Sequence, residues 1–258
     1  MSTVRWKITL QVYRQKGKQT PHYDNFEMEA DPDEYVLDVV ERAWAYHDHT
    51  ICFRHACHHS TCGACGMRVN GVEKLTCITK VASMIKDGGM MRVEPLRNFP
   101  VVSDLAVDMG SFYSRMELVG HREVLPITEV CVQPDTPSTP ALPTWPEGYE
   151  RLSDCISCGL CISACPVSAT DPDYLGPGVL AGAQQNGLAC HPELLPVVDG
   201  ENGVWRCHSA FECTAVCPSY VEPAWRIMDL RKQVIRHRIW QFFHPVRKLA
   251  THSEEASK

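Results

Sequence analysis

Most of the 14 cysteines in this chain fall into three groups whose spacing suits metal coordination. The first group has the spacing C-x4-C-x2-C-x11-C and consists of Cys57, Cys62, Cys65 and Cys77. The other two groups are related runs, CISCGLCISACP at 155–166 and CHSAFECTAVCP at 207–218. Cysteine thiolates hold zinc ions and iron–sulfur clusters. The N-terminal stretch lacks the apolar core of a secretory signal, so we expect the reducing cytosol, where clustered cysteines favour metal over disulfides.

The loop from 57 to 77 predicts a [2Fe–2S] cluster. Its first three cysteines match the spacing of plant-type ferredoxins, and Cys77 is the fourth ligand, from the far strand of a predicted hairpin. Small residues in the loop, Gly63, Ala64 and Gly66, let backbone N–H groups approach the sulfurs. A structural zinc site is the alternative, although such sites usually pair two C-x2-C knuckles and this loop has one.

Other cysteines and histidines are not needed as ligands. Cys52 precedes the loop and is interpreted as a buried apolar residue. His58 and His59 suggest a Rieske centre, in which two histidines hold one iron. Because four cysteines already fill the site, we interpret these histidines as surface residues or as hydrogen-bond donors around the ligands. Cys131 and Cys190 lie outside every group and are interpreted as structural.

The two related runs predict two further clusters. The spacing C-x2-C-x2-C-x3-C-P is typical of bacterial ferredoxins, in which the fourth cysteine of a run ligates the other cluster. This crossing gives one [4Fe–4S] site with four thiolates, from Cys155, Cys158, Cys161 and Cys217. It gives the other site only three, from Cys165, Cys207 and Cys213. Ala210 occupies the fourth position and its methyl group cannot bind iron, so this site is predicted to hold a [3Fe–4S] cluster.

Two alternatives to the [3Fe–4S] cluster stay open. A fourth ligand from Ser209, His208 or Glu212 would complete the site, or the site is degenerate and empty. Pro166 and Pro218 each follow the crossing cysteine, which favours two intact half-sites.

Apolar periodicity predicts an α+β N-terminal part and a helical C-terminal part. A strand is expected at 4–14, a turn at 16–18, a strand at 25–30, a helix within 31–47, a hairpin turn at Asn70-Gly71, a strand at 91–96, helices at 103–119 and 224–240, and a proline-rich linker at 131–150. The predicted domains are a [2Fe–2S] ferredoxin-like β-grasp domain at 1–105, a helical two-cluster ferredoxin-like domain at 106–244 and a polar tail at 245–258.

Composition excludes several function classes. Apolar residues make up 44% and charged residues 22%, as in an ordinary globular protein. No apolar run approaches the roughly 18 residues of a membrane span. The net charge of −6 gives no basic field for nucleic acid. No P-loop, dinucleotide-binding glycine motif or Ser-His-Asp order appears. The pattern therefore predicts an electron carrier, and no catalytic residue is assigned.

The combination of motifs resembles the iron–sulfur subunit of succinate dehydrogenase and fumarate reductase over about residues 4–240. Supporting stretches are FRHAC at 53–57, CGACGMRVNG at 62–71, PVVSDLAVDM at 100–109, DPDYLGP at 171–177 and WRCHSAFECTAVCP at 205–218. The resemblance implies a complex in which a flavoprotein oxidises succinate on FAD. This subunit then passes electrons through [2Fe–2S], [4Fe–4S] and [3Fe–4S] clusters to a membrane anchor and quinone.

The same resemblance implies where the partners bind. The N-terminal domain faces the flavoprotein, the C-terminal domain faces the anchor, and the complex lies on the cytoplasmic face of the inner membrane. Pro166 and His208 match family positions next to quinone. Ala169 and Thr170 stand where many members have aromatic residues, so no tryptophan contact is carried over. A basic strip beside apolar residues at 226–248 is expected to face the anionic leaflet, with a solvated helix face as the alternative.

Two other functions are weighed against the electron-transfer subunit of succinate dehydrogenase. One is the corresponding subunit of a soluble or quinol-linked fumarate reductase. The other is a zinc-stabilised interaction module with no electron flow.

Overall fold

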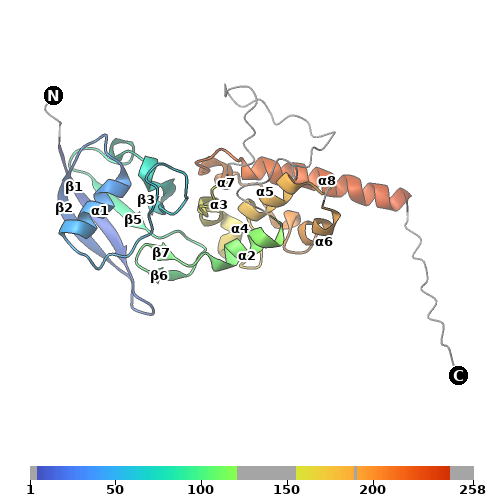
Figure 1. Cartoon of the computed structure of the whole chain (residues 1–258), viewed down its shortest axis with the longest axis horizontal. Helices are drawn as coiled ribbons and strands as arrows, with labels where there is room; N and C mark the ends of the chain where they lie inside the picture. The colour runs from blue at the N-terminus through green and yellow to red at the C-terminus, as the bar shows by residue number, and fades with distance from the viewer. Residues whose placement is uncertain (1–4, 121–154, 189–190, 245–258) are drawn as a thin grey trace.

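The N-terminal part is built on a five-stranded sheet with strand order β2-β1-β5-β3-β4, in which only the β1–β5 pair is parallel. The computed structural model describes residues 5–120, 155–188 and 191–244 (Figure 1). The strands of this sheet are β1 (Trp6–Arg14), β2 (His22–Ala30), β3 (Gly66–Val69), β4 (Val72–Leu75) and β5 (Met90–Glu94). The predicted strands at 4–14, 25–30 and 91–96 correspond to β1, β2 and β5.

Strand β1 and helix α1 (Val36–Tyr46) bury their apolar faces in one core. Alternation along β1 places Ile8, Leu10 and Val12 inside, while the helical repeat of α1 buries a row from Val36 to Ala43. The helix begins where Asp38 accepts a hydrogen bond from the backbone N–H of Tyr35. Each fully buried aliphatic side chain stabilises the fold by roughly 1.5–3 kcal/mol. The burial of these side chains therefore fixes which faces of β1 and α1 point into the core.

The predicted hairpin turn at Asn70-Gly71 joins β3 to β4. Both turn residues have positive φ, 49° for Asn70 and 85° for Gly71, as a two-residue type I′ turn requires. Strand β4 runs into a 3-10 turn, η1 (Thr76–Ile78), which carries Cys77. The hairpin thus delivers this cysteine to the loop at 57–65, where it was expected.

A charge cluster around the buried Arg14, at the end of β1, attaches the segment around the buried Asp104. The guanidinium group of Arg14 lies 2.7 Å from Asp24, 2.5 Å from Asp48 and 3.3 Å from Asp104. Hydrogen bonds from Thr50 and Arg14 hold the pKa of Asp48 below its usual value. Asp104 is fully buried and accepts hydrogen bonds from the backbone N–H groups of residues 15 and 52.

These contacts correct the predicted helix at 103–119. Residues around Asp104 instead form a short antiparallel pair, β6 (Val101–Ser103) and β7 (Ala106–Val107). Asp104 itself has a positive φ of 48°, which ends any helix there. Helix α2 therefore begins only at Gly110 and ends at Leu118.

The C-terminal part is helical. Its elements after residue 154 are α3 (Leu160–Ala164), α4 (Pro166–Thr170), α5 (Pro177–Asn186), η5 (Pro192–Leu194), α6 (Leu195–Val198), η6 (Val204–Arg206), α7 (Glu212–Ala215) and α8 (Pro223–Phe243). The sheet domain has one more short 3-10 turn among its described residues, η2 (Val81–Ser83). Figure 1 shows α8 running along the helical part and projecting away from the sheet. The predicted helix at 224–240 corresponds to α8. The linker at 131–150, Cys131, Cys190 and the tail at 245–258 lie outside the described residues.

Polar contacts fasten the two parts together at α3. The hydroxyl of Ser163 donates to the buried carboxylate of Glu73 (2.9 Å) and accepts from the backbone N–H of Arg97 (2.9 Å). Asn98 donates to three carbonyl oxygens at the end of α3, at 2.7–3.2 Å. These bonds satisfy carbonyls that the end of a helix leaves unpaired, and they hold α3 against the sheet domain.

Candidate metal centres

The loop at 57–65 and the 3-10 turn η1 bring the first four predicted ligands into one neighbourhood. The backbone N–H groups of Thr61 and Cys62 point at the sulfur of Cys57 (3.3 and 3.4 Å), and that of Ser60 points at the sulfur of Cys77 (3.4 Å). Backbone N–H groups directed at thiolates stabilise their negative charge. The loop conformation that aims them includes Gly63, whose φ is +68°.

The four thiols of this loop differ in environment. Hydrogen bonds from the backbone N–H groups of His59 and Cys62 lower the pKa of Cys57 to about 6. Burial raises the pKa of Cys77 to about 12. Cys65 is also buried, whereas Cys62 is exposed. The four cysteine sulfurs of this group therefore extend from the buried turn η1 to the surface, which suits a cluster close to the exterior.

The first run and the last cysteine of the second run line one cavity. Its wall includes Cys155, Cys158, Cys161 and Cys217, and it has ≈ 510 Å³ of atom-free space, part of it open to solvent. Cys217 comes from the other run, as the crossing predicts. Gly178 leaves room beside this cavity, because a Cβ there would lie 3.2 Å from the sulfur of Cys161.

The remaining three predicted ligands line a second, smaller cavity, with ≈ 310 Å³ of atom-free space that includes open solvent. Cys165, Cys207 and Cys213 share its wall with Ala210, and so do Pro166, His208, Ser209 and Glu212. Helix α3 contributes to both cavities, because Cys161 on the helix lines the first and Cys165 at its C-terminal end lines the second.

The alternative fourth ligands are unequally placed around this second cavity. The hydroxyl of Ser209 accepts a hydrogen bond from Arg231 (3.3 Å) and contacts the sulfur of Met228 (3.5 Å), so it is already engaged. Glu212 and His208 are exposed. Ala210 itself is exposed, so the incomplete corner of the site faces outward.

Tyr174 is a site residue that spacing alone did not single out. Its ring is 1% exposed and lines the second cavity, and its hydroxyl is buried with no hydrogen-bond partner among the described residues. Burial and the nearby Cys207 and Cys165 raise its pKa, so the hydroxyl stays protonated. A buried donor without an acceptor costs free energy, and sulfur in this cavity, from Cys207 or from a bound cluster, supplies one.

The thiols of both cavities fit cationic iron. Burial raises the pKa of Cys158 and of Cys213 to about 12, and that of Cys161 and Cys217 above the ordinary value. Several buried thiolates in one cavity therefore require a positively charged partner. The donor set, the room beside Gly178 and the unpartnered hydroxyl of Tyr174 all fit iron–sulfur clusters.

Comparison with known proteins gives the family. The profile of the 2Fe-2S iron-sulfur cluster binding domain matches residues 9–114, and that of the 4Fe-4S dicluster domain matches residues 151–221. The fumarate reductase iron-sulfur subunit of Mycobacterium tuberculosis is 34% identical over 253 residues, which cover 93% of this chain and 97% of that protein. The chain belongs to the fumarate reductase and succinate dehydrogenase iron–sulfur subunit family.

A second relative agrees with this family, and a solved structure agrees with the fold. The mitochondrial succinate dehydrogenase [ubiquinone] iron-sulfur subunit 1 of Oryza sativa is 30% identical over 238 residues, covering 87% of this chain and 81% of that protein. A chain in the solved structure of the Mycobacterium smegmatis Sdh1 complex in the apo form has a TM-score of 0.70 at 22% identity, covering 92% of this chain and 98% of that one. The predicted fold class, a [2Fe–2S] ferredoxin domain followed by a helical two-cluster domain, is confirmed.

As an iron–sulfur subunit of this family, the chain is the electron-transfer component of an oxidoreductase. This membership speaks against the zinc-stabilised interaction module. Across the described ranges, none of the helices combines the length and apolarity needed to cross a bilayer.

The structure corrects the basic strip expected on the last helix. Arg226 is buried and donates to Val221 and Gln184. Arg231 donates to the carbonyl oxygens of Val204 and Cys207, next to the second cavity. The predicted basic strip is therefore wrong for these two arginines, because both donate hydrogen bonds to other residues of the helical domain.

The end of α8 combines aromatic and basic side chains. Arg238 forms a two-pronged ion pair with Asp199 at 2.6 and 2.7 Å. Trp240, Phe242 and Phe243 lie exposed at the far end of the helix, with Phe242 80% exposed. Arg247 and Lys248 lie outside the described residues. Lys232 and Arg236 are also exposed on this helix, so its surface toward the far end carries both basic and aromatic side chains.

Proposed function

We propose that this chain carries electrons from a flavoprotein to a membrane anchor and quinone through three iron–sulfur clusters, as the electron-transfer subunit of a succinate:quinone oxidoreductase. The proposed ligands are Cys57, Cys62, Cys65 and Cys77 for [2Fe–2S]; Cys155, Cys158, Cys161 and Cys217 for [4Fe–4S]; and Cys165, Cys207 and Cys213 for [3Fe–4S]. When bound, such clusters accept and release single electrons at potentials that hydrogen bonds and exposure tune.

The observation that carries this proposal is the serial arrangement of the three cysteine groups. A Cβ on Gly63, in the first loop, would lie 2.5 Å from the carbonyl oxygen of Ile156 and 3.0 Å from Cys158. The loop therefore touches the run that lines the first cavity, and α3 links that cavity to the second. Electron tunnelling falls off exponentially with distance, so direct contact between successive ligand segments supports transfer in this order.

The chain also prepares each site for its charge. Backbone N–H groups of Ser209 and Val221 point at the sulfurs of Cys207 (3.4 Å) and Cys217 (3.3 Å), as others do in the first loop. Leu160 of α3 is buried and forms an apolar part of the wall of the first cavity. In the second cavity, Ala210 offers no ligand and Tyr174 offers a hydrogen-bond donor, which supports a three-iron cluster there.

The ends of the molecule suggest the partner surfaces. The sheet domain, with its exposed cluster loop, is proposed to contact the flavoprotein that carries FAD and the dicarboxylate site. The aromatic end of α8 is proposed to contact a membrane anchor on the cytoplasmic face. Pro166 and the exposed His208, at the rim of the second cavity, are proposed to lie near quinone.

The domain limits, 1–105, 106–244 and a tail at 245–258, stay predictions. The β6–β7 pair spans the first of these limits, and the 2Fe-2S match extends to residue 114. The connection between the domains therefore starts inside a hydrogen-bonded pair and not in a free linker.

Fumarate reduction is the second candidate, because the M. tuberculosis relative is named a fumarate reductase subunit. The electron path is the same in the opposite direction. Comparing succinate oxidation with quinol-driven fumarate reduction in the purified complex separates the two.

Replacing Cys62 with alanine tests the path. The complex co-expressed with flavoprotein and anchor is expected to lose the [2Fe–2S] EPR signal and succinate-driven quinone reduction. Cys52→Ala is the matched control, because this cysteine lies next to the loop but outside the ligand group, and it is expected to retain both. Quinone reduction that persists in Cys62→Ala would show that electrons bypass the first site.

A further inference from the structure

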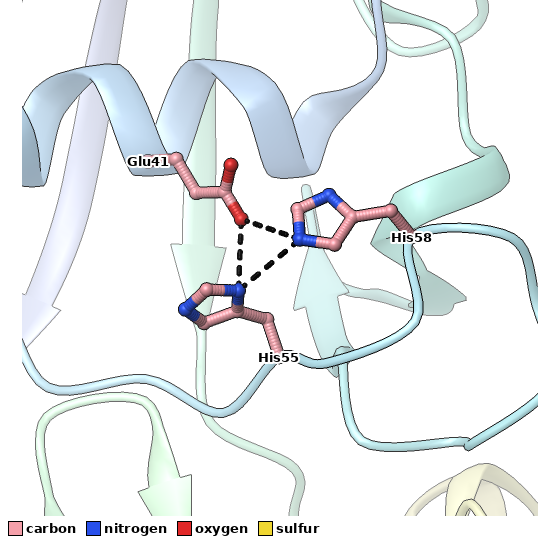
Figure 2. A group of neighbouring side chains, drawn as sticks. All are labelled: Glu41, His55 and His58. Atoms are coloured by element: carbon pink, nitrogen blue, oxygen red, sulfur yellow. Dashed lines mark hydrogen bonds and ion pairs between the residues drawn. The ribbon is translucent and has the colours of Figure 1, made fainter.

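Two histidines and a glutamate meet at the start of the first cluster loop, and none of them is a predicted cluster ligand. Glu41 extends from α1, while His55 and His58 lie on either side of Cys57. Figure 2 shows that each ring turns one nitrogen toward the same carboxylate oxygen. Oε1 of Glu41 lies 2.9 Å from Nδ1 of His55 and 3.1 Å from Nε2 of His58, and the two nitrogens are 3.3 Å apart.

The carboxylate oxygen at the centre of this group makes no hydrogen bond to the described residues, although both rings lie within ion-pair distance of it. The oxygen itself is buried. A buried carboxylate oxygen is costly unless it is paired with a donor or coordinates a cation. Two imidazole nitrogens that face the same oxygen are the usual companions of a carboxylate in a transition-metal site.

The spacing of the three atoms fits one metal ion. A tetrahedral zinc ion with bonds of about 2.0–2.1 Å holds its ligand atoms about 3.3 Å apart. The distances here are 2.9, 3.1 and 3.3 Å. Both histidine side chains are 41% exposed, which leaves the fourth position open to water. Phe53 stacks on the ring of His55 at 4.9 Å and fixes its orientation.

We propose that Glu41, His55 and His58 bind one divalent transition-metal ion of the zinc class. The ion ties α1 to the loop that carries Cys57. This site is independent of the cysteine ligands, because all three of its donor atoms are nitrogen or oxygen. Its consequence is a loop held at two places, by the ion at its start and by the contact of Gly63 with Ile156 further along.

Zinc content of the cluster-loaded complex tests the proposal. Purified complex is incubated with ZnCl2, desalted and measured for zinc and iron, with zinc X-ray absorption to identify the ligands. The wild type is expected to retain one zinc per chain with a nitrogen/oxygen shell at about 2.0–2.1 Å. Hydrogen exchange of the amides at 54–60 is expected to slow when zinc is bound.

Matched variants assign the zinc to this group. His58→Asn is the main variant, since His58 has a φ of +61° and asparagine tolerates that conformation better than most residues. His59→Asn carries the same change one residue on, outside the triangle, and is expected to retain zinc. His58→Asn and Glu41→Gln are expected to lose it with unchanged iron content.

Three outcomes would overturn the site. They are no retained zinc in the wild type, equal zinc in all variants, or a sulfur shell at about 2.3 Å, which identifies cysteine ligands. His55→Gln guards against a variant that fails to fold, because it removes a ligand without touching the strained residue, and its iron content reports intact clusters.

Discussion

The Cα of Gly63 faces the carbonyl oxygen of Ile156 so closely that no side chain fits between the first cluster loop and the first ferredoxin-type run. A Cβ at this position would stand 2.5 Å from that oxygen. Both residues belong to segments far apart in the sequence, and their contact is where the sheet domain meets the helical domain beside the proposed ligands. Small changes here are expected to affect electron transfer and stability together.

Gly63→Ala is expected to slow electron transfer from the first to the second cluster and to destabilise the domain contact. Gly17→Ala is the matched control, since Gly17 also has positive φ (+56°) but a Cβ added there would meet nothing within 4 Å. Both variants bear the left-handed strain, and Gly63→Ala adds overpacking of about 1–3 kcal/mol. Stability in urea and freeze-quench EPR after succinate addition measure the two effects; equal behaviour of the variants would contradict the contact.

Ala210→Cys is expected to convert the third site into a four-iron site. Iron content should rise from about nine to about ten per complex, and the near-isotropic EPR signal of the oxidised [3Fe–4S] centre should diminish. Ala215→Cys adds a cysteine to the same run at an exposed position on α7 outside the cavity wall, and should change neither. An unaltered signal in Ala210→Cys would mean that the third site has different ligands.

Tyr174→Phe is expected to lower the reduction potential of the third cluster. The buried hydroxyl has no partner among the described residues, so a cluster sulfur is its proposed acceptor. Losing a hydrogen bond worth roughly 0.5–1.5 kcal/mol shifts a one-electron potential by roughly 20–60 mV. EPR-monitored redox titration measures this shift. Tyr113→Phe, on α2, should leave the potential unchanged, and a similar shift in both variants would remove the special role of Tyr174.

Replacing Phe242 and Phe243 together with serine is expected to release the subunit from its membrane anchor. Each exposed ring that becomes buried at an interface stabilises the complex by roughly 1.5–3 kcal/mol, so a loss of affinity of at least about 100-fold follows. Membrane flotation of the assembled complex measures it, with cluster content unchanged. Tyr46→Ser, which removes an 82% exposed ring from the sheet domain, is the control. Undiminished flotation of the double variant would place the anchor elsewhere.

Local patterns predicted the cysteine groups and most of the sheet domain. The spacing around Cys217 and Cys165 predicted that each would lie with the other run, and the structure brings them there. The turn at Asn70-Gly71 and the helix at 224–240 were equally readable, because turn chemistry and apolar periodicity act over a few residues. Ligation itself stays a prediction until spectra test it.

Long-range contacts explain what the sequence could not show. Where a helix was predicted to start at 103, the structure has the β6–β7 pair, because Asp104 accepts hydrogen bonds from the backbone N–H groups of residues 15 and 52. Arg231 counted as a surface charge until the structure placed its guanidinium on the carbonyls of Val204 and Cys207. Glu41 was assigned no role from the sequence, since nothing in its neighbourhood along the chain points to histidines on a later loop.

The two cavities are each lined by cysteines from both runs, and this limits when during synthesis their clusters can be inserted. Each cavity takes cysteines from both runs, so neither is closed until residues 155–165 and 207–217 have both been synthesised and packed around α3. The first loop, by contrast, has all four of its cysteines once Cys77 has emerged. Cofactor delivery by the cell's assembly machinery is thus separable into an early event at the N-terminal domain and a late, all-or-none event at the C-terminal domain.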